Sequence, residues 1–245
     1  MDKSKVRPLI FAFLWLVIWQ AASMLTHNSI LLAGPADTVR ALIRLIPQKD
    51  FWMSVGKTTL RICAGLATGI LSGVLLAFIA NKNAVLKDFF APAVAAIKSV
   101  PVASFVVLVL IWSGTELTSY IISTLVVFPI IYLSTLEGLA SIDSKLIEMA
   151  DVFRMRKGLR LRYIYLEGLK PFLTGSISIA AGMSWKSGIA AEVISRPAAS
   201  IGNGIYNSKI YLMTEDLFAW TIIAVLLSFL TERLIRFIMG RALGK

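Results

Sequence analysis

Residues 56–80, GKTTLRICAGLATGILSGVLLAFIA, decide the fold. The part from Ile62 to Ala80 contains no charged side chain, and roughly 20 apolar residues are enough for a helix to cross a bilayer. Gly65, Gly69 and Gly73 recur at every fourth position, so they form a smooth helix face that another helix backbone can approach closely. The stretch therefore predicts a transmembrane helix, and we interpret its glycine face as a packing surface rather than as part of a transport route.

The rest of the chain extends this prediction. Apolar residues make up 57% of the sequence and charged residues 16%, against about 45–50% and about 25% in soluble domains. One soluble core could not bury so many fully apolar helices. We therefore predict an all-α membrane protein with six transmembrane helices, at residues 8–26, 56–80, 88–112, 117–137, 171–191 and 216–239.

The positive charges predict how these spans are oriented. The net charge is +11, and most basic residues fall in segments that share one side of the membrane if the N-terminus is inside. The segment 139–170 is the most basic of them. Cytoplasmic loops carry the excess of Lys and Arg, so both termini are expected in the cytoplasm of a cell whose plasma membrane holds the protein. This topology accounts for the charge better than nucleic-acid binding does.

The N-terminal part is expected to differ from the rest. Residues 8–26 follow a basic start, as a signal peptide would, but Trp15 and Trp19 favour a retained helix. After the break at Gly34–Pro35, Asp37 can cap a short helix with an apolar face suited to the outer membrane surface, made of Val39, Leu42, Ile43 and Ile46. We therefore divide the chain into residues 1–50, with the first span and this amphipathic helix, and a core domain at 51–245.

The basic segment 139–170 is predicted to contain a helix of its own. Asp143 and Ser144 are suitable N-caps, and Glu148 and Asp151 lie off the apolar face. That face consists of Leu146, Ile147, Ala150 and Phe153. An apolar face in a charged loop can lie on lipid or insert into a groove of another protein, and the second is a known mode of helix recognition.

Motifs along the chain support the second alternative. Glu148, Ala150, Leu166 and Pro171 stand where one family of transport proteins has them, although Arg154 replaces a glycine and Glu167 a proline. The same family pattern matches at further positions: Thr58–Arg61 with Gly65, Val100–Pro101, Trp112–Gly114, Phe128–Pro129, Thr135, Gly138, Gly175, Trp185, Ala190–Glu192 and Gly202–Gly204. A second proline that the family has near the position of Val107 is missing here. Over nearly its whole length the chain resembles the permease subunits of binding-protein-dependent ABC importers of the sulfonate, taurine and nitrate type.

The resemblance implies a fold, partners and a coupling site. The fold would be that of a type I ABC importer permease, in which 139–170 carries a cytoplasmic coupling helix. Two copies of the chain would form the pathway in a bacterial inner membrane, two ATP-binding subunits would dock beneath, and a solute-binding protein would deliver solute from outside. The residues assigned to ATPase coupling are Glu148, Met149, Ala150, Asp151, Phe153 and Arg154.

The chain itself is not expected to hydrolyse ATP. Gly56-Lys57-Thr58 ends like a phosphate loop, but Phe51 stands where that loop needs its first glycine. ATP and Mg²⁺ are therefore expected on the partner subunits, and no cofactor on this chain. Cys63 is the only cysteine and His27 the only histidine, which excludes cysteine-based and paired-histidine metal sites.

Charged residues within spans are candidates for the pathway, because charge inside a membrane usually faces a cavity or a partner. Lys98, Lys186 and Glu192 are such residues, and Pro101 and Ser104 accompany Lys98. Two lysines against one glutamate favour an anionic solute such as a sulfonate, taurine or nitrate. Alternatively, Glu192 pairs with a basic residue for structural reasons, and Lys98 extends to the membrane surface.

Two other functions remain open from the sequence. A secondary transporter driven by an ion gradient would need paired carboxylates within spans, and Glu192, at the end of the span 171–191, is the one carboxylate that we take as a candidate. A membrane-embedded enzyme is disfavoured because the chain has one histidine and no cluster of carboxylates.

Overall fold

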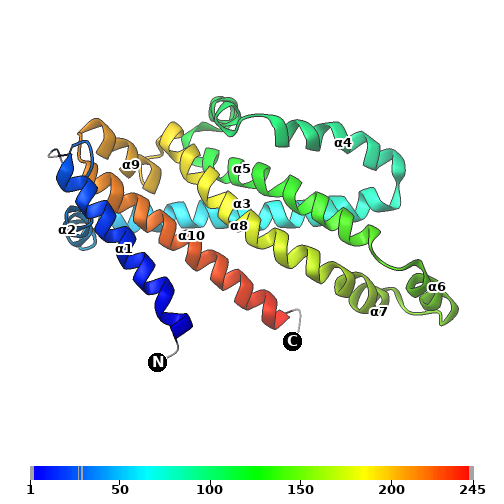
Figure 1. Cartoon of the computed structure of the whole chain (residues 1–245). Helices are drawn as coiled ribbons and strands as arrows, with labels where there is room; N and C mark the ends of the chain where they lie inside the picture. The colour runs from blue at the N-terminus through cyan, green and yellow to red at the C-terminus, as the bar shows by residue number, and fades with distance from the viewer. Residues whose placement is uncertain (1–2, 27, 29, 243–245) are drawn as a thin grey trace. The chain divides into compact units, whose positions relative to one another are not determined.

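The computed structural model describes residues 3–26, 28 and 30–242, and Figure 1 traces the chain through them. Within these residues the regular structure is entirely helical, with no strand. The helices are α1 (Lys3–Leu25), α2 (Pro35–Leu45), α3 (Lys49–Lys82), α4 (Ala84–Ser99), α5 (Val102–Ala140), α6 (Ser144–Val152), α7 (Lys157–Arg160), the π-helix η1 (Leu161–Tyr165), α8 (Leu166–Ser195), α9 (Ile201–Ile210) and α10 (Thr214–Ala242). His27 lies outside the described residues.

Two of the described helices, α3 and α5, are long and apolar enough to cross a membrane. Helix α3 contains the predicted span 56–80, and α5 contains the predicted span 117–137. Helices α1, α8 and α10 coincide with three further predicted spans, whose crossing of the membrane stays a prediction.

The predicted span 88–112 is not one continuous helix, and its crossing of the membrane stays a prediction. Helix α4 ends at Ser99, Val100 is extended at φ −75° and ψ 133°, and Pro101 precedes the first residue of α5. Proline has no N–H to donate and its ring pushes the preceding residue out of the α-region, so the helix stops there. Pro101 therefore separates two helices instead of lying inside one.

Gly114 interrupts α5 a second time. Its backbone has φ 71° and ψ 178°, a conformation open to essentially no residue but glycine. A side chain at this position would meet nothing within 4 Å, so the backbone conformation alone calls for glycine here. The helix therefore has a short arm before Gly114 and a long arm after it.

The described chain forms two compact units. Unit 1 comprises Met1–Thr58 and Arg196–Val225, and unit 2 comprises Thr59–Ser195 and Leu226–Lys245. The boundaries fall within α3 and α10, each of which contributes to both units. The division at residue 50 followed the order of the predicted spans, and it stays a prediction.

Unit 1 packs around aromatic side chains. The rings of Phe51 and Trp220 are 4.9 Å apart between centroids. Gly204 on α9 lies so close to Trp220 that an added methyl group would be 2.5 Å from the indole. The Thr58 hydroxyl accepts a hydrogen bond of 3.0 Å from the backbone N–H of Ile201, at the start of α9. These contacts fix α3, α9 and α10 to one another within the unit.

Helix α2 begins earlier than the sequence suggested. Pro35 occupies its first turn and Gly34 is the N-cap, while Asp37 accepts a 3.4 Å hydrogen bond from the Gly34 N–H instead of capping the helix itself. Proline suits the first helical position because it lacks only an N–H that would have no helical partner. Val39 and Ile43 are 52% and 66% exposed, as a face on the membrane surface requires, and that placement stays a prediction.

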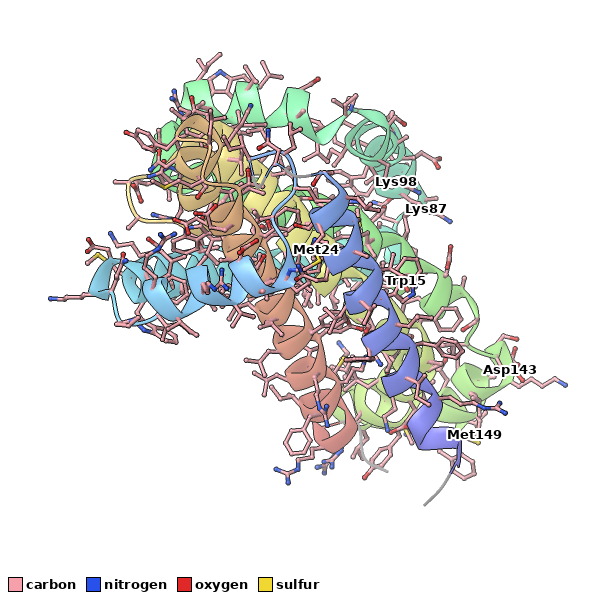
Figure 2. All side chains as sticks on the ribbon, turned by 60° about the vertical axis from the view of Figure 1, so that its left-hand side comes forward. Trp15, Met24, Lys87, Lys98, Asp143 and Met149 are labelled. Carbon is pink, nitrogen blue, oxygen red and sulfur yellow. The ribbon has the colours of Figure 1, made fainter. Side chains whose placement is uncertain are left out.

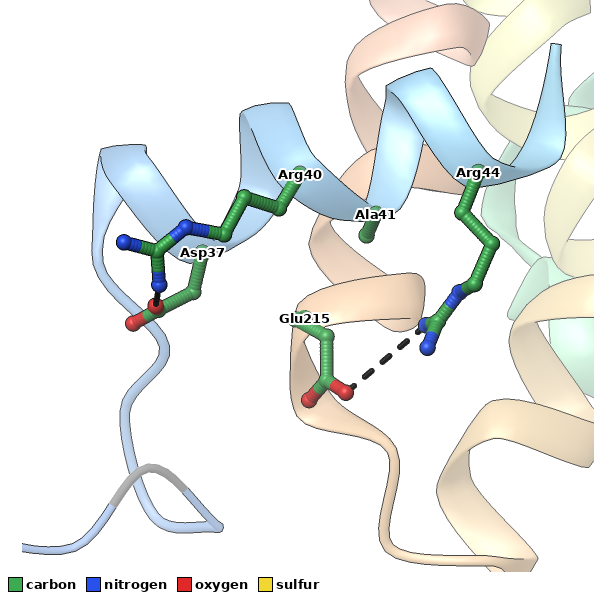
Figure 3. A pocket seen from close by; sticks show the side chains of 5 residues that line it. All are labelled: Asp37, Arg40, Ala41, Arg44 and Glu215. Carbon is green, nitrogen blue, oxygen red and sulfur yellow. Dashed lines mark hydrogen bonds and ion pairs between the residues drawn. The ribbon is translucent and has the colours of Figure 1, made fainter.

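The charged side chains of α2 border a hollow in unit 1 (Figure 3). Arg40 pairs with Asp37 at 3.1 Å, and Arg44 reaches Glu215 at 3.8 Å and pairs also with Asp216. Each of the two arginines lining the hollow is thus matched by a carboxylate of the same unit.

Unit 2 is built on close contact between α3, α5 and α8. Methyl groups on Gly65 and Gly69 would lie 2.6 Å from the carbonyl oxygen of Tyr120 and 2.7 Å from the side chain of Val127. The predicted glycine face is thereby confirmed as a packing surface for another helix, the long arm of α5. The buried core between these helices consists of Leu66, Val127, Ile131, Ile177, Ala180 and Ala181.

Candidate functional site

Helix α6 is a short, separately capped helix in the basic segment. The Asp143 carboxylate accepts a 2.9 Å hydrogen bond from the N–H of Lys145, which confirms the predicted cap. Two residues after the helix, Arg154 has φ 48°, and the Met155 N–H donates to the Ala150 carbonyl at 2.8 Å. This left-handed residue ends a helix in the way a glycine usually does. Arg154 stands where the resembled family has glycine, and it adopts the left-handed conformation although it has a side chain.

The apolar side chains of α6 divide into a buried and an exposed set. Ala150 is 1% exposed and Ile147 is half-buried, so both face the protein itself. The prediction that Ala150 belongs to the face offered to a partner is therefore wrong. The exposed apolar residues, with their exposed fractions, are Leu146 (45%), Met149 (43%), Val152 (79%) and Phe153 (76%), and we call them the α6 apolar surface.

A charged contact links α6 to the helix that follows. Arg160 on α7 pairs with Asp151 at 2.5 Å, and its guanidinium lies 6.0 Å from the ring of Tyr165. Burial acts to lower the pKa of Arg160, but hydrogen bonding with Asp151 and Tyr165 outweighs it and raises the pKa, so the guanidinium stays charged. Tyr165 also contacts Phe78 of α3, with 6.2 Å between ring centroids. The segment is thus held to unit 2 at its second half, while the α6 apolar surface stays open.

The structure brings five of the six predicted coupling residues together on one exposed segment. Glu148, Met149, Asp151, Phe153 and Arg154 are all exposed on α6 or the turn after it. Figure 2 shows Met149 near the cap residue Asp143 at the α6 end of the unit, far from Lys98 on α4.

The five predicted pathway residues do not form one cluster. Lys98, Pro101 and Ser104 are exposed at the junction of α4 and α5, and Lys186 is exposed on α8. Glu192 on α8 is 0% exposed. Among the described residues, neither lysine forms an ion pair.

Glu192 belongs to a buried charge network instead. Its Oε1 atom lies 3.3 Å from Nη1 of Arg61 on α3 and accepts a 3.4 Å hydrogen bond from Ser119 on α5. Arg61 pairs also with Glu116, which is more than half exposed, beside the break at Gly114. Of the two alternatives for Glu192, the structure supports pairing with a basic residue.

Sequence reasoning missed Arg61 and Glu116 as members of a site. Arg61 lies within the predicted span 56–80, so the rule that selected Lys98 as an intramembrane charge would also have selected Arg61. Glu116 fell between two predicted spans and was left out for that reason. In the described part of the chain, no group of three His, Cys, Asp or Glu side chains could hold a metal ion.

Comparison with known proteins supports the resemblance. Residues 69–243 match the family described as "Binding-protein-dependent transport system inner membrane component". The chain is 24% identical to the taurine transport system permease protein TauC of Escherichia coli (strain K12), over 94% of this chain and 86% of that protein. It is 28% identical to the bicarbonate transport system permease protein CmpB of Synechococcus elongatus, over 82% and 76%. It is 24% identical to the riboflavin transport system permease protein RibX of Chloroflexus aurantiacus, over 91% and 86%.

The match covers most of the chain and includes α6, α8 and α10. It also settles questions that the sequence left open. Permeases of this family leave ATP hydrolysis to a separate subunit and work without a cofactor, so the chain is not itself an enzyme. This chain belongs to the family of binding-protein-dependent transport system inner membrane components.

Proposed function

We propose that two copies of this chain form the translocation pathway of an ATP-driven importer in a bacterial inner membrane. Each copy crosses the membrane six times with both termini in the cytoplasm. Two ATP-binding subunits dock on the cytoplasmic side, and a solute-binding protein delivers the solute from outside.

The α6 apolar surface carries the proposal. Leu146, Met149, Val152 and Phe153 are exposed in a segment otherwise rich in basic residues. Covering apolar surface is favourable by about 25 cal/mol per Å², so a groove that takes these side chains would gain affinity from each. The cap at Asp143 and the ion pair between Asp151 and Arg160 hold the helix in place before a partner arrives. A preformed helix loses less freedom on docking.

Cysteine crosslinking tests the docking site. In a Cys63→Ala background, Met149→Cys and Phe153→Cys should each crosslink to the ATP-binding subunit in membranes. Tyr211→Cys is the matched control, because Tyr211, directly after α9, is 70% exposed in a segment expected on the outer side. Crosslinking that is equal at all three positions, or label found only in lipid while uptake persists, would contradict the proposal.

We also propose an anionic solute, and Lys98 and Lys186 support it. Relatives of similar identity are named for solutes as different as bicarbonate and riboflavin, so the family does not choose the solute. Glu192 is already paired with Arg61, and neither lysine forms an ion pair with a carboxylate of the described residues. Away from bulk water, a positive charge attracts an anion far more strongly than it does in water.

A further inference from the structure

The last part of α10 borders an open hollow to which the proposed import function assigns no role. The hollow has a volume of about 650 Å³ and is lined by Phe229, Glu232, Arg233 and Arg236. All four belong to unit 2 and lie near the end of the predicted span 216–239, on the expected cytoplasmic side. The hollow thus lies where a membrane span meets the lipid headgroups.

The one acidic residue of the hollow is already engaged. Glu232 accepts a 2.8 Å hydrogen bond from Ser178 on α8 and pairs with Arg236. The Nε atom of Arg236 donates to the same Ser178 hydroxyl at 3.0 Å. Arg233, in contrast, forms no ion pair with any carboxylate of the described residues. The hollow therefore offers an arginine whose charge is not balanced locally.

Exposed apolar side chains flank Arg233 along α10. Phe229 precedes it by one helical turn and is 65% exposed, and Leu230 and Leu234 are 63% and 55% exposed. On an α-helix, Phe229 and Arg236 are separated by roughly 10 Å along the axis. A ligand that fits this arrangement has an anionic group at the level of the arginines and an apolar chain extending toward Phe229.

We propose that this hollow binds an anionic phospholipid of the inner leaflet. Arg233 holds the phosphate, Arg236 adds charge from the next turn, and an acyl chain packs along Phe229. Arginine suits the first role because its planar guanidinium can donate two parallel hydrogen bonds to phosphate oxygens. Basic pockets on the cytoplasmic side of membrane helices are suited to anionic headgroups in general, because the leaflet there is negatively charged.

Native mass spectrometry of the purified protein tests the proposal. The protein is titrated with phosphatidylglycerol, with phosphatidylcholine and with inorganic phosphate, and we expect retention of phosphatidylglycerol alone. Arg233→Gln should weaken that binding about fivefold, the effect expected from one basic residue near an anionic surface. Arg233→Lys keeps the charge and should keep most of the affinity. Lys209→Gln on α9 removes one exposed charge elsewhere and should leave the affinity unchanged.

Three outcomes would overturn the proposal. Retention of phosphatidylcholine as well as phosphatidylglycerol would make the contact ordinary lipid packing. Displacement of the lipid by inorganic phosphate at equal concentration would make the site one for a soluble anion. Binding of phosphatidylglycerol by Arg233→Gln as tightly as by the unchanged chain would remove Arg233 from the site. The comparison of phosphatidylglycerol with phosphatidylcholine uses the unchanged chain, so it tests the proposal even if a variant fails to fold.

Discussion

The guanidinium of Arg61 lies 3.3 Å from the carboxylate of Glu192, and both side chains are largely withdrawn from solvent, at 11% and 0% exposed. The two residues come from α3 and α8, so the contact ties together helices far apart in the sequence. A charge out of water is costly unless it is paired, and the fully buried Glu192 therefore depends on Arg61, which also pairs with Glu116.

Arg61→Met should destabilise the protein strongly. Glu192 would stay buried while losing its ion pair with Arg61, and breaking a buried pair costs about 3–5 kcal/mol. Thermal unfolding in detergent would measure this as a lower Tm. Arg61→Met combined with Glu192→Met should recover part of the loss, because no buried charge then remains. Arg40→Met is the control, since that side chain is 79% exposed and pairs only at the surface. Equal Tm values for Arg61→Met and Arg40→Met would contradict the dependence.

Gly65→Ala should lower stability although alanine favours helices. The added methyl group would lie 2.6 Å from the Tyr120 carbonyl oxygen, so α3 and α5 must separate, at a cost of about 1–3 kcal/mol. Gly56→Ala in the same helix meets nothing within 4 Å, and it should be neutral or stabilise by up to about 1 kcal/mol. Thermal unfolding of both variants is the measurement, and a stable Gly65→Ala protein would show that the helices can adapt.

Arg154→Gly should stabilise the end of α6. The residue has φ 48°, and a left-handed conformation costs a residue with a side chain about 1 kcal/mol. Hydrogen exchange at the Met155 N–H, which donates to Ala150, should slow in this variant. Arg156→Gly removes the same charge at a position with φ −60°, so it relieves no strain and should show no such slowing. Faster exchange in Arg154→Gly would mean that the arginine side chain itself holds the turn.

Glu148→Arg should impair coupling without affecting membrane insertion. Glu148 is exposed on α6 beside the α6 apolar surface, so charge reversal would disturb a docked partner and not the fold. We expect normal expression, with loss of solute-stimulated ATP hydrolysis in the reconstituted complex. Glu148→Gln keeps the shape and removes only the charge, which separates the two contributions. Full uptake by Glu148→Arg at normal expression would exclude this role.

Lys98→Met and Lys186→Met should each reduce uptake of an anionic solute. Both side chains are exposed, so their loss should leave stability nearly unchanged. The cognate binding protein, screened by thermal shift, identifies the solute, and uptake in vesicles is then compared for each variant. Lys209→Met removes a lysine from α9 and serves as the control. A neutral or cationic solute whose uptake is unchanged in both variants would end the anion proposal.

The sequence predicted those features that depend on local pattern. The glycine spacing in 56–80 predicted close helix packing, and Asp143 predicted the start of α6. Pro101 also indicated a helix end from local sequence alone, because proline interrupts helices whatever the hydropathy of its neighbours. The apolar character of 88–112 predicted one span across that proline, because hydropathy does not depend on the backbone.

The remaining features depend on tertiary contact, which no local pattern contains. Arg61 and Glu192 are far apart in the sequence, and nothing in either segment alone names the other as partner. Helical spacing placed Ala150 on the apolar face of α6, but spacing does not say which side of an apolar helix the chain itself covers. In the structure the small Ala150 is covered and the larger Met149 and Phe153 are left exposed.

The π-helix η1 has a consequence for how relatives of this chain should be aligned. The Leu166 N–H donates to the Leu161 carbonyl, five residues back, so this turn holds one residue more than an α-helical turn. One extra residue rotates everything that follows by about 100° relative to an uninterrupted α-helix. The faces of α7 and α8 are therefore one position out of phase. A relative with one residue fewer between 161 and 165 can keep both the Asp151–Arg160 contact and the packing of α8. A single-residue gap at this place in an alignment therefore indicates that the π-helical turn is absent, and not that the fold has changed.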